Sequence, residues 1–224
     1  MSQIRNQKDV MTKSASEKTV QVRDPVATQN RILKAAKREF AQKGLGGARI
    51  DVVAEKAKSN KRMIYHYFGS KEELFQKVVE HSYLDIRAAE KKLNLESLEP
   101  KDAVETLVRF TWNYYLKNPE FLTLVNSENL HRAVHLKKSV EIKAAQNSMV
   151  ASMTNILARG VEQGVFRAGV DPEQLVITIA AVNYYYLNNK YTGAILFNRD
   201  FMDAESLQQR LDFNVDTIMR ILQP

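Results

Sequence analysis

Apolar residues recur at helical spacing along almost the whole chain, and prolines stand at or just before the start of several of these patterns. Pro25, Pro119 and Pro172 each follow an Asp or Asn that can cap a helix, and Pro100 opens a further pattern. We find no alternating strand pattern and no Asn-Gly hairpin turn. The sequence therefore predicts an all-α fold of about nine helices, without internal repeats.

These patterns divide the chain into three parts. Residues 1–23 are polar and lack an apolar period, so we expect a disordered arm. Residues 24–70 hold three short helical patterns, and residues 71–224 form a larger helical domain. The predicted helices run over about 25–43, 50–57, 60–68, 71–94, 101–117, 120–135, 138–163, 172–197 and 203–222.

Composition excludes several classes of protein. The chain contains no cysteine, which rules out disulfides, thiolate catalysis and cysteine metal sites. No apolar run is long enough to span a bilayer, and the N-terminus lacks the apolar core of a signal peptide. We therefore expect a cytoplasmic protein that does not contact a membrane.

The positive charge is concentrated near the N-terminus. Residues 26–70 carry ten Lys or Arg and three acids, which equals the whole net charge of +7, so the remainder sums to zero. A basic block beside a neutral body points to a polyanionic partner for that block alone. The alternative is a solvated basic face without a partner.

Within this block, two short helices flank a tight turn. Ile50, Val53, Ala54 and Ala57 share one helix face, and the pattern breaks at 58–59. Asn60 can cap the next helix, and the sequence from Ser70 to Glu73 is a capping box that opens a long helix. The second short helix places Ile64, Tyr67 and Phe68 inward and Lys61, Arg62, Tyr65 and His66 outward.

This arrangement indicates a helix-turn-helix that binds double-stranded DNA. Arg62 suits a guanine edge through its bidentate fork, whereas Lys61 suits phosphate. Arg49 could reach a backbone phosphate from the start of the first short helix. Lys71 stands where free backbone N–H groups also favour phosphate. The predicted DNA-binding residues are Arg49, Ser59, Asn60, Lys61, Arg62, Tyr65, His66, Tyr67 and Lys71.

Residues 28–75 resemble the N-terminal domain of the TetR family of regulators. The resemblance rests on Ala36, Phe40 and Gly44, on the Val53-Ala54-x-x-Ala57 pattern, and on the run from Ile64 to Leu74. It implies a DNA-binding domain on a larger all-α domain, usually a homodimeric repressor released from a palindromic operator by a small molecule. Residues 118–131 resemble, over a shorter stretch, the RutR-like branch of pyrimidine-utilisation regulators.

The chain departs from the family pattern at three places. Ala48 and Arg49 stand where two threonines are common, and Lys58-Ser59-Asn60 replaces a common Gly-Val-Ser at the turn. Arg62 stands where glycine is common. These departures bear on the operator sequence rather than on the fold. The added basic side chains should strengthen binding to phosphate.

The last two predicted helices carry long apolar stripes. One stripe holds Leu175, Ile179, Val182 and Tyr186, and the other holds Leu207, Leu211, Val215, Ile218 and Leu222. The stripes could be core, or they could form a two-fold dimer interface that matches a palindromic DNA site. We favour a homodimer through these two helices.

Polar groups among aromatic residues are candidates for an effector pocket, since such pockets combine apolar walls with a few placed polar groups. The candidates are Trp112, Asn113, Tyr114, Phe121, Asn126, Asn129 and Tyr184, with Asn183 and Tyr185 beside them. Their alternative role is core packing or helix capping. The effector itself is not identified.

Glu128, His131 and His135 share a helix face, an arrangement that also occurs in metal-binding bundles. Only two other histidines exist, so we favour surface or capping roles and expect no metal or other cofactor. Three other functions remain open: an activator rather than a repressor, a small helical enzyme, for which we find no catalytic cluster, and a non-specific, DNA-compacting protein without an effector. We expect no enzymatic activity.

Overall fold

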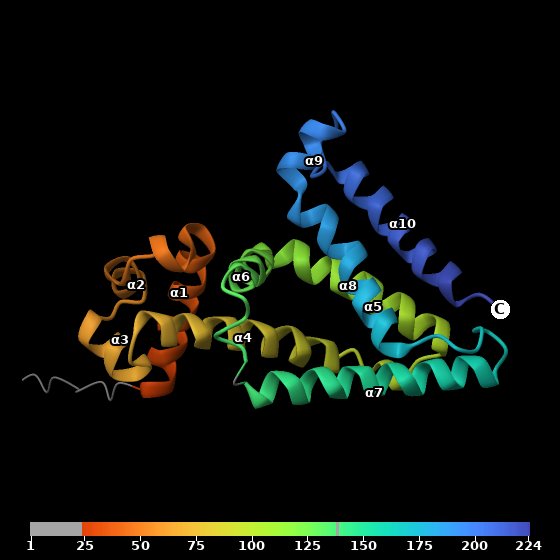
Figure 1. Cartoon of the computed structure of the whole chain (residues 1–224), viewed down its shortest axis with the longest axis horizontal. Helices are drawn as coiled ribbons and strands as arrows, with labels where there is room; N and C mark the ends of the chain where they lie inside the picture. The colour runs from red at the N-terminus through yellow and green to blue at the C-terminus, as the bar shows by residue number, and fades with distance from the viewer. Residues whose placement is uncertain (1–23, 138) are drawn as a thin grey trace, which may run out of the picture.

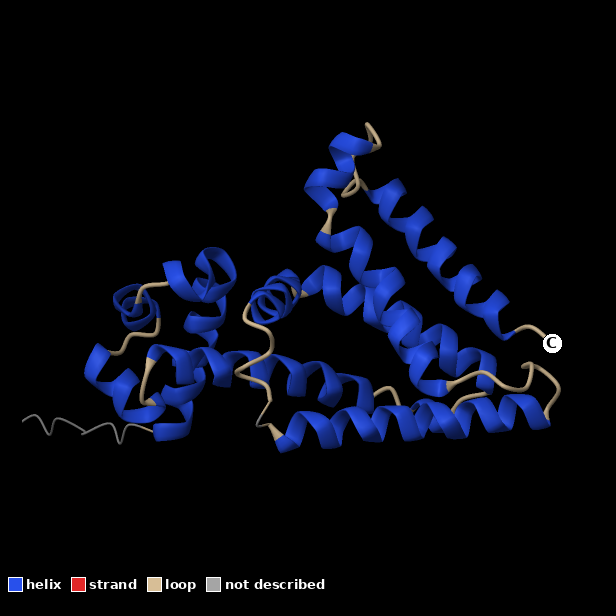
Figure 2. Cartoon of the chain, in the orientation of Figure 1, coloured by secondary structure: helices blue, strands red, loops and turns tan. Residues whose placement is uncertain are grey.

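The computed structural model describes residues 24–137 and 139–224, and this part of the chain is built from helices and loops without a strand (Figure 1, Figure 2). The predicted arm, 1–23, lies outside it. The α-helices are α1 (Pro25–Gly47), α2 (Ile50–Lys56), α3 (Lys61–Phe68), α4 (Lys71–Lys91), α5 (Pro100–Lys117), α6 (Pro119–Leu130), α7 (Val140–Glu162), α8 (Pro172–Asn188), α9 (Lys190–Leu196) and α10 (Ala204–Leu222), and a 3-10 helix, η1, covers Leu95–Ser97.

The first three helices gather at one end of the molecule as a head, and α4 runs from the head into the body, where it ends beside α7 (Figure 1). Ile32 and Phe40 of α1 pack with Ile64 of α3 and with Phe75 of α4, and all four side chains are buried. The rings of Phe40 and Phe75 pack edge to face, with their centroids 5.2 Å apart. The core of the head therefore includes the first turns of α4, which ties the head to the body.

The body has its own core, formed mainly by α5, α7, α8 and α10. Trp112 of α5 is 2% exposed and lies 5.8 Å from the ring of Tyr186 in α8. In Figure 1, α7 runs alongside α4, whereas α8 and α10 rise away from them toward α9. Among the described helices, none is long and apolar enough to cross a membrane.

The described residues form one more α-helix than expected, because the predicted helix 172–197 is divided at Asn189. The side chain of Asn189 donates a hydrogen bond to the carbonyl oxygen of Tyr185, and its backbone leaves the helical region. An Asn side chain competes with the helical hydrogen bonds in this way. The chain then turns, and α9 packs its Gly193 against Phe201.

Two other helices end earlier than predicted. The helix predicted to reach residue 94 ends at Lys91, and Asn94 has a positive φ of 50°. The helix predicted to reach residue 135 ends at Leu130. The carboxylate of Glu128 accepts hydrogen bonds from the backbone N–H groups of His135 and Leu136, which holds the following segment in a turn rather than a helix.

The apolar stripes of the last two predicted helices lie in the core of a single chain. Leu175, Ile179 and Tyr186 are buried, and so are Leu211, Val215, Ile218 and Leu222, while Val182 and Leu207 are half-buried. The prediction that these particular residues form a dimer interface was wrong. Their burial against α5 leaves the opposite faces of α8 and α10 exposed.

Candidate nucleic-acid interface and effector cavity

Helix α2 lies against α1 through its apolar face. Ile50, Val53 and Ala54 are buried in the core of the head. A buried carboxylate, Glu39 of α1, accepts a hydrogen bond from the backbone N–H of Arg49 at 3.3 Å and from the Lys56 ammonium at 3.2 Å. It thus holds both ends of α2. The sequence offered no sign of this role, since Glu39 looks like any other acid on a helix.

The turn between α2 and α3 is closed by backbone hydrogen bonds. Lys58 adopts a left-handed conformation with a φ of 50°, and the backbone N–H of Ser59 donates to the carbonyl oxygen of Ala54. The side chain of Asn60 then accepts from the backbone N–H of Met63 at 2.9 Å, as predicted for a cap. Lys58 thus occupies a backbone conformation that favours glycine.

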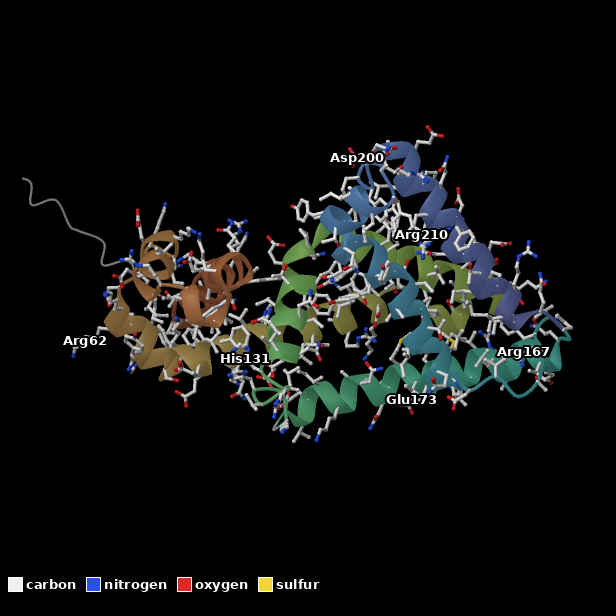
Figure 3. All side chains as sticks on the ribbon, turned by 45° about the horizontal axis from the view of Figure 1, so that its top comes forward. Arg62, His131, Arg167, Glu173, Asp200 and Arg210 are labelled. Carbon is white, nitrogen blue, oxygen red and sulfur yellow. The ribbon has the colours of Figure 1, made fainter. Side chains whose placement is uncertain are left out.

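Helix α3 presents a basic and aromatic face to solvent. Ile64 is fully buried and anchors the helix, while Lys61, Arg62, Tyr65 and His66 are exposed. Arg62 projects from the far end of the molecule and has no ion-pair partner within residues 24–137 and 139–224 (Figure 3). A slim helix with this outer face suits the major groove of DNA.

Asp51, in the first turn of α2, pairs with two of the predicted phosphate contacts. Its carboxylate lies 2.5 Å from the Lys61 ammonium and 3.6 Å from the Arg49 guanidinium. The hydrogen bond from Lys61 is the main cause that lowers the pKa of Asp51 below its ordinary value. Asp51 therefore holds the two cations at the junction of α2 and α3.

The remaining predicted contacts differ in their exposure. Ser59 lies half-buried in the turn, and Tyr67 is half-buried against the core of the head. The Lys71 ammonium donates to the carbonyl oxygen of Gly46 at 3.2 Å, close to the end of α1. Ser70 caps α4 by accepting from the backbone N–H of Glu73, as the capping box predicts.

The predicted effector residues separate into two groups. Asn126, on α6, accepts a hydrogen bond from the Tyr184 hydroxyl and donates one to Asn188, and the Tyr114 hydroxyl donates to Asp85. Phe121 packs against Tyr114 and Tyr115. By contrast, Trp112 is core, while Asn113 and Asn129 point to solvent.

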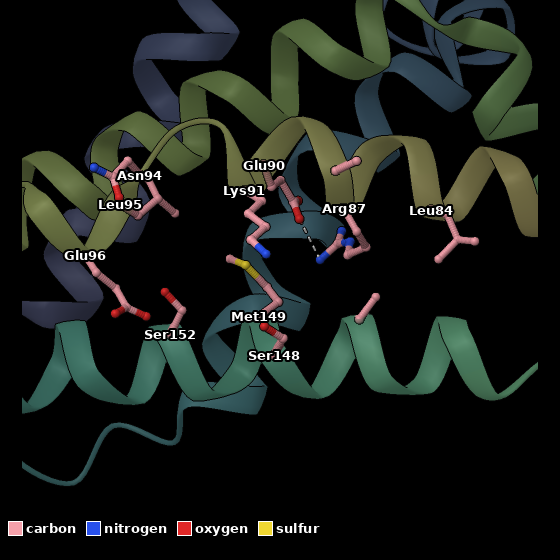
Figure 4. Close-up of a pocket in the computed structure, with 12 residues that line it drawn as sticks. Leu84, Arg87, Glu90, Lys91, Asn94, Leu95, Glu96, Ser148, Met149 and Ser152 are labelled. Atoms are coloured by element: carbon pink, nitrogen blue, oxygen red, sulfur yellow. Dashed lines mark ion pairs between the residues drawn. The ribbon is translucent and has the colours of Figure 1, made fainter.

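A cavity of about 650 Å³ lies elsewhere, between α4 and α7 (Figure 4). None of the seven predicted effector residues lines it. Its polar lining includes Arg87 and Glu90, whose side chains form an ion pair at 2.9 Å. Burial raises the pKa of Glu90 to about 7, although Arg87 opposes that shift. The sequence pattern of α4 gave no signal that distinguished these two charged residues from solvated ones.

His131 and His135, which follow α6, lie where the body meets the head. The Glu128 carboxylate accepts a hydrogen bond at 2.7 Å from Nδ1 of His135 when that nitrogen carries the proton. The rings of His131 and His135 pack against Phe75 of α4. Glu128 therefore has the capping role that we favoured, and it orders the segment that joins α6 to α7 where the body meets the head.

Comparison with known proteins agrees with the geometry of the head. A family model described as "Bacterial regulatory proteins, tetR family" matches residues 32–78, and one described as "Tetracyclin repressor-like, C-terminal domain" matches residues 100–218. The chain belongs to the TetR family. It is thus a DNA-binding transcriptional regulator, and the resemblance seen in the sequence is confirmed.

Individual relatives of this TetR-family chain match it over most of their length. It is 38% identical to the HTH-type transcriptional repressor NicS of Pseudomonas putida over 88% of this chain and 92% of that protein. It is 29% identical to the regulator RutR of Escherichia coli over 82% of this chain and 88% of that protein. The solved structure of the TetR-family regulator PfmR from Thermus thermophilus aligns with a TM-score of 0.59 and 26% identity, covering 87% of this chain and all of that one.

Proposed function

We propose that this chain is a repressor that binds a palindromic operator as a homodimer and leaves it when a small molecule occupies the body. The observation that carries the proposal is the exposed face of α3, where Lys61, Arg62, Tyr65 and His66 stand on a buried Ile64 anchor. The name of NicS as a transcriptional repressor supports the sign of regulation.

The proposed dimer surface lies on the outer faces of α8, α9 and α10. Ile177, Ala181 and Tyr185 share the solvent face of α8, because they are four residues apart. Tyr191, Ile195 and Leu196 of α9 are each more than three-quarters exposed. A cluster of large apolar side chains that are exposed to solvent marks an interaction surface. A second copy suits it, since a two-fold dimer would present two copies of α3 to successive major grooves.

Helix α4 supplies the proposed link between effector and DNA. Phe75 near its start belongs to the core of the head, and Glu90 near its end lines the cavity beside α7. A continuous helix of 21 residues joins these positions. A ligand that binds better to one placement of α4 would favour the matching separation of the two α3 helices, and so change the affinity for DNA.

Selection of bound duplexes from a random-sequence pool tests this function. The proposal expects enrichment of a palindrome whose half-sites are about one helical turn, or a multiple of one turn, apart. Binding of the selected duplex should weaken steeply with salt, since each neutralised phosphate releases counterions. If the protein retains all duplexes equally, whatever their sequence, the result favours a non-specific DNA-compacting protein. If the protein is a monomer whose affinity for DNA does not change with salt, the result contradicts the proposal.

A further inference from the structure

More than half of the positive charge of the head lies outside the helix-turn-helix. Residues 26–70 carry a net charge of +7, and α1 supplies five bases and one acid of this total, a net +4. The acid, Glu39, is 4% exposed and is paired with Lys56 of α2. Residues 48–70, which include α2 and α3, therefore account for only +3. The charge of α1 requires an explanation of its own.

The bases of α1 lie on its solvent face. Arg31, Lys34 and Arg38 are exposed, and Lys37 is partly exposed beside them. Positions 31, 34 and 38 are three and four residues apart, so their side chains form one row about 10 Å long. The opposite face of the helix packs into the core of the head. We call these four residues the basic row of α1.

The basic row has no acidic partner in the part of the chain that the structure describes, because Lys34, Lys37 and Arg38 form no ion pair with residues 24–137 or 139–224. By contrast, α4, α5 and α10 each contain an ion pair between a base and an acid one turn apart. Lys34 and Arg38 are four residues apart, a spacing at which like charges repel and destabilise a helix. A polyanionic partner would remove this repulsion.

The basic row is continuous with the DNA-reading surface. Nε of Arg31 donates a hydrogen bond at 3.4 Å to the carbonyl oxygen of Ala57, where α2 ends and the turn to α3 begins. Nη2 of Arg31 donates to the Thr28 hydroxyl at 3.0 Å. Arg31 is thus fixed beside the turn, and the other bases of the row follow it along α1, which lies beside α2 in Figure 1.

We propose that the basic row of α1 is a second phosphate-binding surface, which contacts the duplex flanking the half-site that α3 reads. This inference rests on the proposed function, because it requires α3 to occupy the major groove. A duplex carries one negative charge per about 1.7 Å of its axis, so about six phosphates lie along a row of this length. An acidic protein would match the charge as well, but the contact between Arg31 and the α2–α3 turn favours the duplex that α3 already binds.

Phosphate contacts add affinity without sequence preference, because every base pair carries the same phosphates. The basic row should therefore lengthen the bound duplex and leave the selected palindrome unchanged. This expectation separates its role from that of α3, which reads base edges.

Fluorescence anisotropy with duplexes of two lengths tests the proposal on the full chain. The short duplex is the selected palindrome, and the long duplex adds about one helical turn of arbitrary sequence on each side. We expect the wild-type chain to bind the long duplex about tenfold more tightly than the short one, because more phosphates are neutralised. Equal affinity for the two duplexes would overturn the proposal.

A pair of double variants locates the contact. Lys34→Gln with Arg38→Gln removes two exposed bases from the row, and the matched control, Lys101→Gln with Lys143→Gln, removes two exposed bases from α5 and α7. We expect the first variant, but not the control, to lose the tenfold gain on the long duplex and to bind the short duplex as the wild type does. Its salt slope on the long duplex should fall by about 3 to 4, since a dimer loses four bases.

Three results would contradict the assigned surface. An equal loss in the control would mean that net charge alone matters. An unchanged first variant would mean that the row is solvated or binds an acidic protein. A loss on the short duplex as large as the loss on the long one would place the row within the half-site rather than beside it.

Failure of this inference is distinguishable from failure of the proposed function. If selection yields a palindrome but neither the flanks nor the first variant alters binding, only the inference fails. If selection yields no palindrome, the proposed function fails, and the variant and its control are compared on a long random duplex instead. A loss confined to the first variant on that duplex would still support phosphate binding by α1.

Discussion

Lys61 and Arg62 are neighbours on α3, yet their surroundings differ. The Lys61 ammonium is held by Asp51 at 2.5 Å, whereas Arg62 has no ion-pair partner within 24–137 and 139–224. A lysine acts as a point charge toward phosphate, and an arginine can read a guanine through two parallel hydrogen bonds. The two side chains should therefore make different contributions to DNA binding.

Arg62→Ala is expected to relax the preference at one base pair of each half-site and to cost about 1–3 kcal/mol on the preferred sequence. Lys61→Ala should weaken binding to preferred and scrambled duplexes alike and reduce the salt slope by about 1. Fluorescence anisotropy with both duplexes over a range of salt concentrations measures the two effects. An equal loss on both duplexes for Arg62→Ala would show that Arg62 does not read a base.

At the scale of the element, the turn between α2 and α3 depends on Lys58. Its φ of 50° lies in the left-handed region, which costs a residue with a Cβ about 1–2 kcal/mol. The backbone hydrogen bonds that close the turn and the Asn60 cap keep Lys58 there. The departure from the family's common glycine thus places strain in the turn that orients α3.

Lys58→Gly is expected to be about 1 kcal/mol more stable to unfolding than Lys58→Ala, because only glycine adopts this conformation without the Cβ penalty. Comparing the two variants cancels the loss of the lysine charge. Urea denaturation followed by circular dichroism measures the difference. A Lys58→Ala protein as stable as the Lys58→Gly protein would mean that the turn relaxes when the side chain changes.

At the scale of the whole molecule, the apolar side chains that remain exposed are concentrated on α8, α9 and α10. Tyr185 is 58% exposed and Ile195 is 82% exposed. Because they are not part of the core of one chain, charged substitutions there should leave the fold intact. They should, however, prevent the burial of this surface against a second copy.

The double variant Tyr185→Glu with Ile195→Glu is expected to sediment as a monomer at micromolar concentration and to bind the selected duplex at least tenfold more weakly. The control is Val140→Glu, a similarly exposed position (72%) on α7. Analytical ultracentrifugation with an operator titration checks both expectations. A double variant that stays dimeric would place the interface elsewhere.

Features determined by neighbours in the sequence were predictable. Asp24, Asn60 and Ser70 cap their helices, and the basic face of α3 lies where the apolar period of the helix placed it. Caps and periodicity act within about one helical turn, so a single sequence contains the information needed to predict them.

Other features depend on residues far apart in the chain, and only the tertiary structure decided them. The Glu39 carboxylate of α1 accepts a hydrogen bond from the backbone N–H of Arg49, just before α2. The cavity beside Arg87 and Glu90 of α4 exists because α7 forms its opposite wall. From the sequence, the apolar stripe of α8 was compatible with core as well as with the dimer interface that we favoured, and the structure shows that α5 and α10 cover it. Periodicity shows that a face is buried, but long-range packing alone decides what buries it.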